Sequence, residues 1–258
     1  MFIRVHSWLS SIVSPKKYLP YFLGVLVLSC GVYLNSLHND FNLDDNAIIK
    51  ENPLIRTLSN LPKIFVSNYW ANTPYEKGVL LYRPLVIATF AVDYALWGNN
   101  PFGFHLANLL INVANAALVL LLLAMLFDNQ LRPLQLALAA LLFVFHPIHT
   151  EAVNMVVGRT ELLATMFGLL TFIFYLRGWQ KTAFLTFFLA LLSKEIAVTI
   201  PIMIFLYERL FSANRSSENV TFEPRPPHRS TRKIERKDDA DESAPNSPQI
   251  ISEVNIRN

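Results

Sequence analysis

The sequence predicts an all-α polytopic membrane protein, with about six transmembrane helices and a long first outer loop that carries interfacial helices. Of its 258 residues, 53% are hydrophobic and only 16% are charged, and the mean hydropathy is +0.34. A soluble domain of this size carries about 25% charged residues. Several uncharged stretches also approach the roughly 20 apolar residues that a membrane-spanning helix needs. These observations exclude a soluble fold and argue against nucleic acid as a partner.

Two uncharged stretches give the clearest spans. Tyr18–Leu37 follows Lys16 and Lys17, is too long for a signal-peptide core and lacks a clear cleavage site, so we interpret it as a retained anchor. Phe104–Phe127 is the strongest span. Residues 1–17, which precede the first span, are expected in the cytoplasm because basic residues flank cytoplasmic span ends.

Shorter apolar stretches follow in the second half of the chain. Pro133–Ile148 and Leu162–Leu176 are predicted to be the third and fourth spans. The last apolar region, residues 178–211, would be about 51 Å long as a single helix, which is too long for one crossing. Lys194 and Glu195 interrupt it, so we expect two short spans over residues 178–193 and 196–211.

The orientation depends on Tyr82–Trp97, which is apolar but short and contains Arg83 and Asp93. As an interfacial helix, it leaves most basic residues on the side of the N-terminus, which the positive-inside rule makes cytoplasmic. As a span, it would move several of them outside. We therefore expect six spans, both termini in the cytoplasm and an outer loop over residues 38–103.

The region after the last span, residues 212–258, has eight basic and eight acidic side chains and almost no apolar periodicity. Such a composition is typical of disorder, so we expect a disordered cytoplasmic tail. Its glycosylation sequons, at Asn214 and Asn219, would then stay unmodified. The single cysteine, Cys30, lies in an apolar run and indicates packing rather than a disulfide or a cysteine-based metal site.

Asp44 and Asp45 follow the first span, at the start of the outer loop. Adjacent carboxylates near a bilayer surface suggest a general base or a cation ligand. The simpler interpretation is an Asp-rich turn that caps a helix beginning at Ala47. Both interpretations stay open on the residues alone.

A second polar motif, with His146, His149 and Glu151, follows the third span. These side chains would suit a zinc ion or hydrogen bonds to a phosphate, although their spacing matches no strong zinc pattern. The alternative is a polar interface at a helix end, with Pro147 starting a new turn.

Charged pairs mark the beginning of the fourth span and the interruption of the last apolar region. The guanidinium of Arg159, close to Glu161, would suit a phosphate or a carboxylate, or would simply reach water at the rim. Lys194 and Glu195 should face water or each other, because charges are costly inside a membrane.

The predicted topology brings the polar candidates to one face. Arg83 begins the interfacial segment, and His105 and Asn108 lie at i, i+3 on one face of the second span. Carboxylates for acid–base chemistry beside cations for phosphate suit transfer from a phosphate-bearing lipid. The residues expected on the outer face are Asp44, Asp45, Arg83, His105, His146, His149, Glu151, Arg159, Glu161, Lys194 and Glu195.

The order of these motifs resembles a known family. The motifs are Phe41-x-x-Asp44-Asp45, Asn52-Pro53-Leu54-Ile55, Tyr82-Arg83-Pro84-Leu85, His105-x-x-Asn108, His146-Pro147-Ile148-His149-Thr150-Glu151-Ala152-Val153, Gly158-Arg159-x-Glu161-Leu162-Leu163 and Leu192-Ser193-Lys194-Glu195. Together they resemble the N-terminal membrane region of the transmembrane and tetratricopeptide-repeat-containing proteins. Those proteins are similar to O-mannosyltransferases of the GT-C class of membrane glycosyltransferases. The resemblance covers about residues 20–211.

The resemblance implies a polyprenyl- or dolichyl-phosphate sugar, mannose-like, as donor and a protein hydroxyl as acceptor on the luminal or periplasmic face. It implies that Asp44 or Asp45 is the catalytic base and that Arg159 and Lys194 are candidates for the lipid phosphate. The His146, His149 and Glu151 side chains would shape the same cavity. A divalent cation is compatible with such a site but is not assigned.

Family members usually have more spans and a large tetratricopeptide array, so we expect this chain to be a truncated form. One alternative is a non-catalytic membrane scaffold or regulatory form, or a subunit that a second chain completes with spans or repeats. Another is a small transporter or metal-binding membrane protein built on His146, His149 and Glu151. The membrane would be a bacterial or archaeal cytoplasmic membrane or that of the endoplasmic reticulum.

Overall fold

A computed structural model describes residues 15–76, 81–127 and 130–218, which form helices and turns without β-strands. This confirms the predicted all-α membrane fold. The chain divides into two units, residues 1–213 and 214–258, and the description below concerns the first. Most of the predicted segments 1–17 and 212–258, with the Asn219 sequon, lies outside the described residues.

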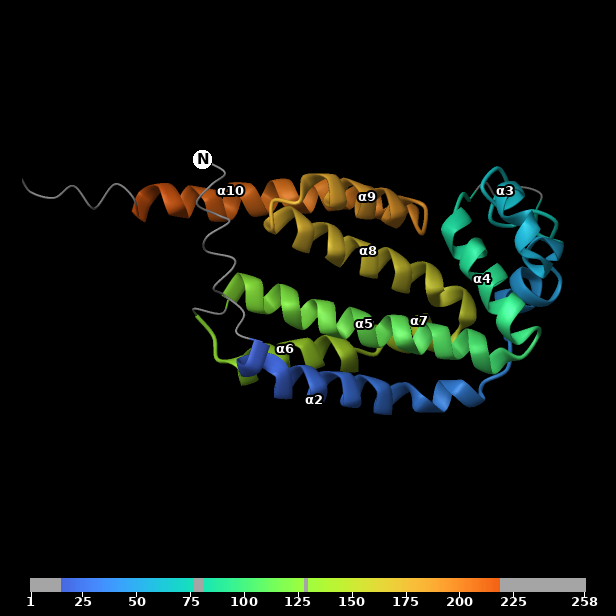
Figure 1. Cartoon of the computed structure of the whole chain (residues 1–258), viewed down its shortest axis with the longest axis horizontal. Helices are drawn as coiled ribbons and strands as arrows, with labels where there is room; N and C mark the ends of the chain where they lie inside the picture. The colour runs from blue at the N-terminus through green and yellow to red at the C-terminus, as the bar shows by residue number, and fades with distance from the viewer. Residues whose placement is uncertain (1–14, 77–80, 128–129, 219–258) are drawn as a thin grey trace, which may run out of the picture. The chain divides into compact units, whose positions relative to one another are not determined.

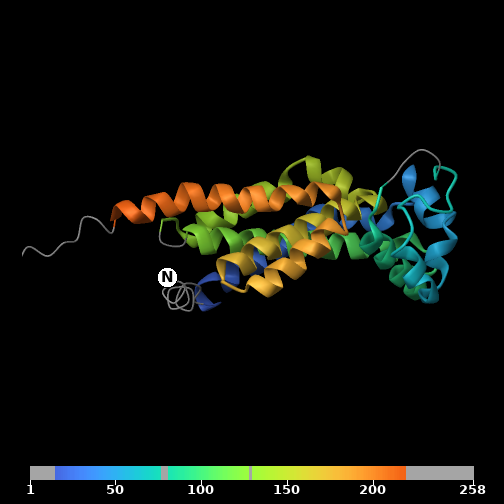
Figure 2. The ribbon, with the colours of Figure 1, turned by 90° about the horizontal axis from the view of Figure 1, so that it is seen from above.

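The body of the first unit is a bundle of apolar helices (Figures 1 and 2). Helix α2 packs against α5 and α6, α5 also packs against α8, and α8 packs against α9. Helix α10 follows α9 after a short 3-10 turn, η6. The bounds are α2 Pro15–Tyr33, α5 Pro101–Phe127, α6 Pro133–Phe145, α8 Arg159–Leu176, α9 Gln180–Leu191, η6 Glu195–Thr199 and α10 Ile200–Glu218.

A stripe of small and branched residues explains how α5 occupies the centre of the bundle. Ala116, Leu120 and Ala124 repeat every fourth residue on one side of the helix and are fully buried. Leu110 lies on another side and is exposed, as a lipid-facing residue would be. Small side chains let neighbouring membrane helices approach closely, so packing positions α5 between α2, α6 and α8.

Three helical segments among the described residues are long and apolar enough to cross a membrane. They are Lys17–His38, Pro101–Phe127 and Val156–Leu176, which cover the predicted first, second and fourth spans. The predicted third span is broken: α6 ends at Phe145 and α7 (Ile148–Asn154) continues at an angle of 64°. Helix α9 is shorter, so length and composition support three spans, or four with the bent pair, and the count of six stays a prediction.

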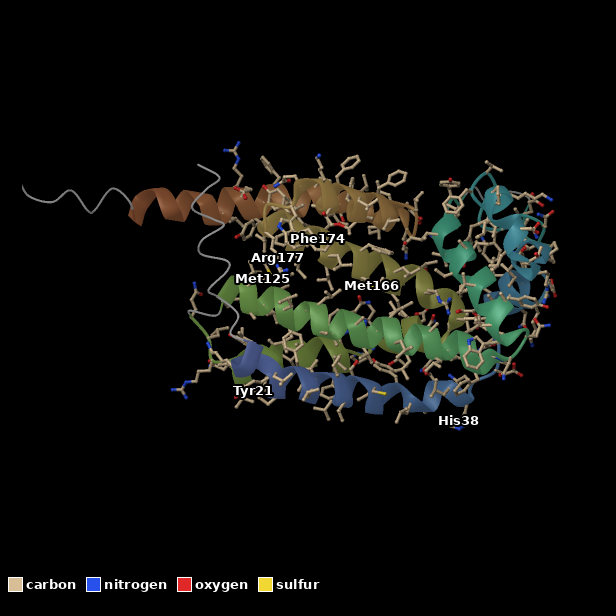
Figure 3. The ribbon with its side chains drawn as sticks, in the orientation of Figure 1. Tyr21, His38, Met125, Met166, Phe174 and Arg177 are labelled. Atoms are coloured by element: carbon tan, nitrogen blue, oxygen red, sulfur yellow. The ribbon has the colours of Figure 1, made fainter. Side chains whose placement is uncertain are left out.

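Labelled side chains identify the two ends of the bundle (Figure 3). Tyr21, near the start of α2, lies at the same end as Arg177, just after α8 (Figure 3). His38 lies at the opposite end, where the outer loop begins (Figure 3). Alternate helices of the bundle therefore run in opposite directions, and the loops that carry the polar motifs meet at the His38 end.

The outer loop folds into a helical cap at that end, where Figure 1 shows α3 and α4. Apolar residues from the whole loop bury one another, among them Phe41, Ile48, Ile55, Val86 and Phe90. Helix α4 covers most of the segment predicted as an interfacial helix. The bounds in the cap are η1 Leu34–His38, η2 Asn46–Lys50, η3 Pro53–Arg56, η4 Leu58–Asn60, α3 Leu61–Ile64 and α4 Pro84–Trp97.

Candidate functional site

A cavity of about 620 Å³ opens where the cap meets the bundle. The outer loop supplies Asp44, Tyr69, Trp70, Leu81 and Arg83, and the bundle supplies the rest of the wall from α5, α6, α7, η5 (Val156–Gly158) and α8. Both parts of the wall combine polar or charged side chains with apolar ones. The helix residues that line it are Asn115, Phe143, Ile148, His149, Glu151, Ala152, Met155, Val157, Gly158, Thr160, Glu161, Leu162 and Thr165.

The structure brings together some of the predicted site residues and separates others. Those that line the cavity are Asp44, Arg83, His149, Glu151 and Glu161. Lys194 and Glu195 do not line it but form ion pairs with two residues that do. The remaining candidates, which lie outside the lining, are Asp45, His105, His146 and Arg159.

The two adjacent aspartates have different environments. Asp45 is fully buried, and its carboxylate accepts backbone N–H groups of Val156 at 3.3 Å and Val157 at 2.8 Å. It also accepts the N–H of Asn42 at 3.2 Å. Burial raises the pKa of Asp45, and these hydrogen bonds oppose that shift. Asp44 is exposed on the cavity wall, so it is the carboxylate that a ligand can reach.

Asp45 is therefore one of the residues that connect the cap to the bundle. One interpretation of the sequence was an Asp-rich turn that caps a helix beginning at Ala47. A helical turn, η2, does begin close to this position, at Asn46, but the side chain of Asp45 does not cap it. The Asp45 carboxylate instead caps η5, the turn that leads into α8. Gly158 ends this turn, and a Cβ there would collide with the backbone of Ala152, so the close approach requires glycine.

Arg159 is the most buried basic residue of the described chain, with 1% of its surface exposed. Its guanidinium forms an ion pair with Asp93 of α4 and lies 4.6 Å from the Phe90 ring. Its Nε donates to Asn108 Oδ1 at 2.7 Å and its Nη2 to the Phe104 carbonyl at 2.9 Å. These contacts join α4, α5 and α8, and they would have to break before Arg159 could bind a phosphate.

The polar row on α5 is buried against η5 and α8. Asn108 donates to the carbonyls of Met155 and Val156, at 3.0 and 3.2 Å. His105 is fully buried, and neither ring nitrogen has a hydrogen-bond partner among the described residues. Asn115 continues the row and reaches the cavity wall, with its Nδ2 donating to the Leu162 carbonyl at 3.0 Å.

Two ion pairs hold the turn after α9 against the cavity. Arg83 forms a bidentate pair with Glu195, with distances of 2.6 Å from Nη2 to Oε1 and 3.1 Å from Nε to Oε2. Lys194 pairs with Glu161. The hydrogen bond from Arg83 lowers the pKa of Glu195, so that side chain is ionised at neutral pH. Both cations of this region are therefore paired with carboxylates.

The histidine motif lies at the break between α6 and α7. His146 ends α6, and its Nδ1 accepts the backbone N–H of Ile148 at 3.3 Å. His149 lies with its ring centroid 4.2 Å from that of Phe143 and lines the cavity. No group of three or more His, Cys, Asp or Glu residues that could hold a metal ion occurs among the described residues.

The sequence analysis did not identify an aromatic turn of the outer loop that lines the cavity. Tyr69 and Trp70 line the cavity and pack edge to face, with ring centroids 5.4 Å apart. The Asn68 side chain accepts the N–H of Trp70 at 2.8 Å, and Tyr69 donates its own N–H to the Leu81 carbonyl at 2.7 Å. The adjacent aromatic pair in the outer loop was the available signal.

The fold and the cavity define a class: an all-α membrane protein with a charged cavity at one end of its helical bundle. Sequence comparison adds the family. The chain is 34% identical over 195 residues to the protein O-mannosyl-transferase TMTC3 of Homo sapiens, covering 71% of this chain and 20% of that protein. It is 31% identical over 229 residues to Tmtc3 of Drosophila melanogaster, covering 76% and 24%.

The protein O-mannosyl-transferase TMTC4 of Homo sapiens is 32% identical over 190 residues, which cover 67% of this chain and 25% of that protein. These matches confirm the predicted resemblance: the chain is a relative of the transmembrane and tetratricopeptide-repeat-containing proteins. It spans a quarter or less of the length of these three relatives. No family model and no solved structure matches the chain.

Proposed function

We propose that this chain is part of a membrane glycosyltransferase that moves a mannose-like sugar from a polyprenyl- or dolichyl-phosphate donor to a protein hydroxyl. The observation that carries the proposal is the cavity, whose lining contains both an accessible carboxylate, Asp44, and a cation, Arg83. The relatives are named protein O-mannosyl-transferases, which supports the reaction class. The active face would be luminal or periplasmic.

In this proposal Asp44 is the general base. Its carboxylate takes the proton from the acceptor hydroxyl, and that oxygen attacks the anomeric carbon of the sugar. The bond between the anomeric carbon and the phosphate oxygen breaks, and the lipid phosphate leaves with the bonding electrons. Asp44 is favoured over Asp45 because it is exposed to the cavity, whereas Asp45 is buried under backbone donors.

The leaving phosphate gains negative charge, so it needs cations aimed at it. Arg83 lines the cavity, and Lys194 forms an ion pair with Glu161, which also lines it. We assign both cations to the binding of the phosphate. Arg159 is given a supporting role, since its donors already bind Asn108 and the Phe104 carbonyl. The apolar helix residues of the wall, such as Ile148 and Leu162, would contact the lipid.

A second candidate function is a non-catalytic scaffold or regulatory form that keeps the cavity. Its support is that Arg83 and Lys194, the cations nearest the cavity, are both paired with carboxylates of the chain itself. A second chain that supplies further spans or repeats would then complete the site.

Transfer of labelled mannose from dolichyl-phosphate mannose to a protein acceptor, in membranes that carry this chain, tests the proposal. We expect transfer by the wild type and a loss of at least about 100-fold in Asp44→Asn, the range for a removed general base. Asp40→Asn, an exposed loop carboxylate outside the cavity lining, is the matched control. Equal transfer by the wild type and Asp44→Asn would show that Asp44 is not the general base. Donor binding without any transfer would favour the scaffold.

A further inference from the structure

We propose that the carboxylates of Glu195 and Glu161 pair with Arg83 and Lys194 as long as no ligand is bound. A phosphate-bearing ligand then binds these two cations by displacing the carboxylates. The inference rests on the proposed function and describes how its anion site is controlled. The pairs Arg83–Glu195 and Lys194–Glu161 are called the resting pairs below.

The first resting pair uses the part of Arg83 that a phosphate would need. The guanidinium presents Nε and Nη2 to the two carboxylate oxygens of Glu195, at 3.1 and 2.6 Å. A phosphate offers two oxygens to the same fork in the same planar arrangement. The Glu195 carboxylate and a ligand phosphate therefore compete for one edge of Arg83.

The second resting pair is linked to the first through the chain. Lys194 and Glu195 are neighbours at the start of η6, where Lys194 has an extended backbone and its side chain pairs with Glu161 at the beginning of α8. The same turn therefore contributes a cation to one pair and a carboxylate to the other. Movement of this turn would release Arg83 and Lys194 together.

The charge balance of the cavity favours exchange over simple addition of an anion. Asp44 and Glu151 bring two further carboxylates to the wall besides Glu161. With the resting pairs formed, both cations are already neutralised. Asp44 and Glu151 have no ion-pair partner among the described residues, so the described part of the wall is negative. A phosphate added to this arrangement would be repelled, so the cations have to leave their carboxylates before they can bind it.

The exposure of the two carboxylates allows this exchange. The side chain of Glu195 is 60% exposed and that of Glu161 is 47% exposed, so either carboxylate can return to water. The side chains of Arg83 and Lys194 are only 13% and 23% exposed, so the phosphate has to replace each departing carboxylate beside its cation. The pair between Arg159 and Asp93 is buried on both sides and cannot exchange in this way, which separates a structural cation from the exchangeable ones.

The test measures lipid-phosphate binding to the purified 258-residue chain in nanodiscs, using tryptophan fluorescence, since Trp70 lines the cavity. Dolichyl monophosphate is the probe, with dolichol and inorganic phosphate as separate arms that distinguish the headgroup of a lipid from free phosphate. We expect Glu195→Gln and Glu161→Gln each to bind dolichyl monophosphate roughly 2- to 5-fold more tightly than the wild type, the range that loss of an exposed pair allows.

Glu51→Gln is the matched control, because it removes one exposed carboxylate of the outer loop outside the cavity lining and should leave binding unchanged. Circular dichroism checks that every variant is folded. Equal or weaker binding by Glu195→Gln and Glu161→Gln would overturn the exchange and show that these carboxylates orient the cations or do nothing. An equal gain in Glu51→Gln would overturn it as well, because the effect would then be one of net charge.

Arg83→Gln separates this inference from the proposed function. If Arg83→Gln loses binding while Glu195→Gln gains nothing, the phosphate site stands and the exchange does not. If neither the wild type nor any variant distinguishes dolichyl monophosphate from dolichol, both the exchange and the assigned phosphate site are overturned. Tighter binding of inorganic phosphate alone would keep the exchange but assign it to a soluble anion.

Discussion

The carboxylate of Asp45 accepts the backbone N–H of Val157 at 2.8 Å, from a residue 112 positions further along the chain. The same carboxylate also accepts the N–H of Val156. One buried side chain thus joins the beginning of the outer loop to the turn that starts α8. Asp44, the preceding residue, is held on the cavity wall beside that connection.

We expect substitution of Asp45 to lower both stability and activity, and substitution of Asp44 to lower activity alone. Asp45→Ala removes the acceptor of one buried N–H group, that of Val156, and of two partly buried ones, those of Asn42 and Val157. A buried N–H without an acceptor costs about 1–3 kcal/mol. We expect a lower free energy of unfolding for Asp45→Ala and an unchanged one for Asp44→Ala, measured by chemical denaturation in detergent. Sugar transfer should fall in both variants. An unchanged stability in Asp45→Ala would contradict the structural role.

The buried carboxyl of Asp45 also predicts a pH dependence. Desolvation raises its pKa in the folded state above the ordinary value of 3.8. Protonation therefore favours the folded state: the contribution is complete below the unfolded pKa and is lost as pH rises through the folded pKa. The free energy of unfolding of the wild type should fall over that window relative to Asp45→Asn. Parallel curves for the two proteins would contradict the assignment.

The buried pair between Arg159 and Asp93 should behave as one unit. Removing either partner leaves an unpaired buried charge, which costs about 3–5 kcal/mol. We expect Arg159→Met and Asp93→Leu each to be strongly destabilising and the double variant to be less so than the sum of the two. The double-mutant cycle on unfolding free energies measures this coupling. Additive losses would show that the pair contributes nothing beyond packing.

Gly158 provides a test of the turn that Asp45 caps. A Cβ at this position would meet the backbone of Ala152, which cannot move aside as a flexible side chain would. Gly158→Ala should therefore lower stability and reduce transfer. Gly24→Ala is the matched control, since a Cβ there meets nothing within 4 Å. That control should be neutral or gain about 0.5–1 kcal/mol, because alanine favours a helix over glycine.

The helices could be predicted from the sequence more fully than the contacts between them. The uncharged run Phe104–Phe127 predicted α5 well, and Pro101 explains why the helix begins slightly earlier. The third span was predicted over residues 133–148, and the alternative for its histidine motif was a helix end with Pro147 starting a new turn. The structure agrees with that alternative, because Pro147 separates α6 from α7. Proline cannot continue the backbone hydrogen bonds of a helix, so the break has a local cause that hydropathy alone does not weigh.

The site could be predicted only as a set of residues. The topology predicted from the distribution of basic residues placed Asp44, Arg83 and Glu161 on one face, and all three line the cavity. The roles of Asp45 and Arg159 could not be predicted, since their partners lie far away in sequence: Val157 for Asp45 and Asp93 for Arg159. Burial and pairing of a charge are properties of the packed structure, and neighbouring residues in the sequence do not determine them.

The bend of 64° between α6 and α7 has a consequence for water. Backbone carbonyls that lose their helical partners cannot face hydrocarbon, because lipid offers them no hydrogen bond. The end of α6 must therefore lie either at the membrane surface or beside a hydrated space, and Phe143 and Ile148 on either side of the break line the cavity. The break between these helices thus places unpaired backbone carbonyls next to the cavity, where water rather than lipid can be their hydrogen-bond partner.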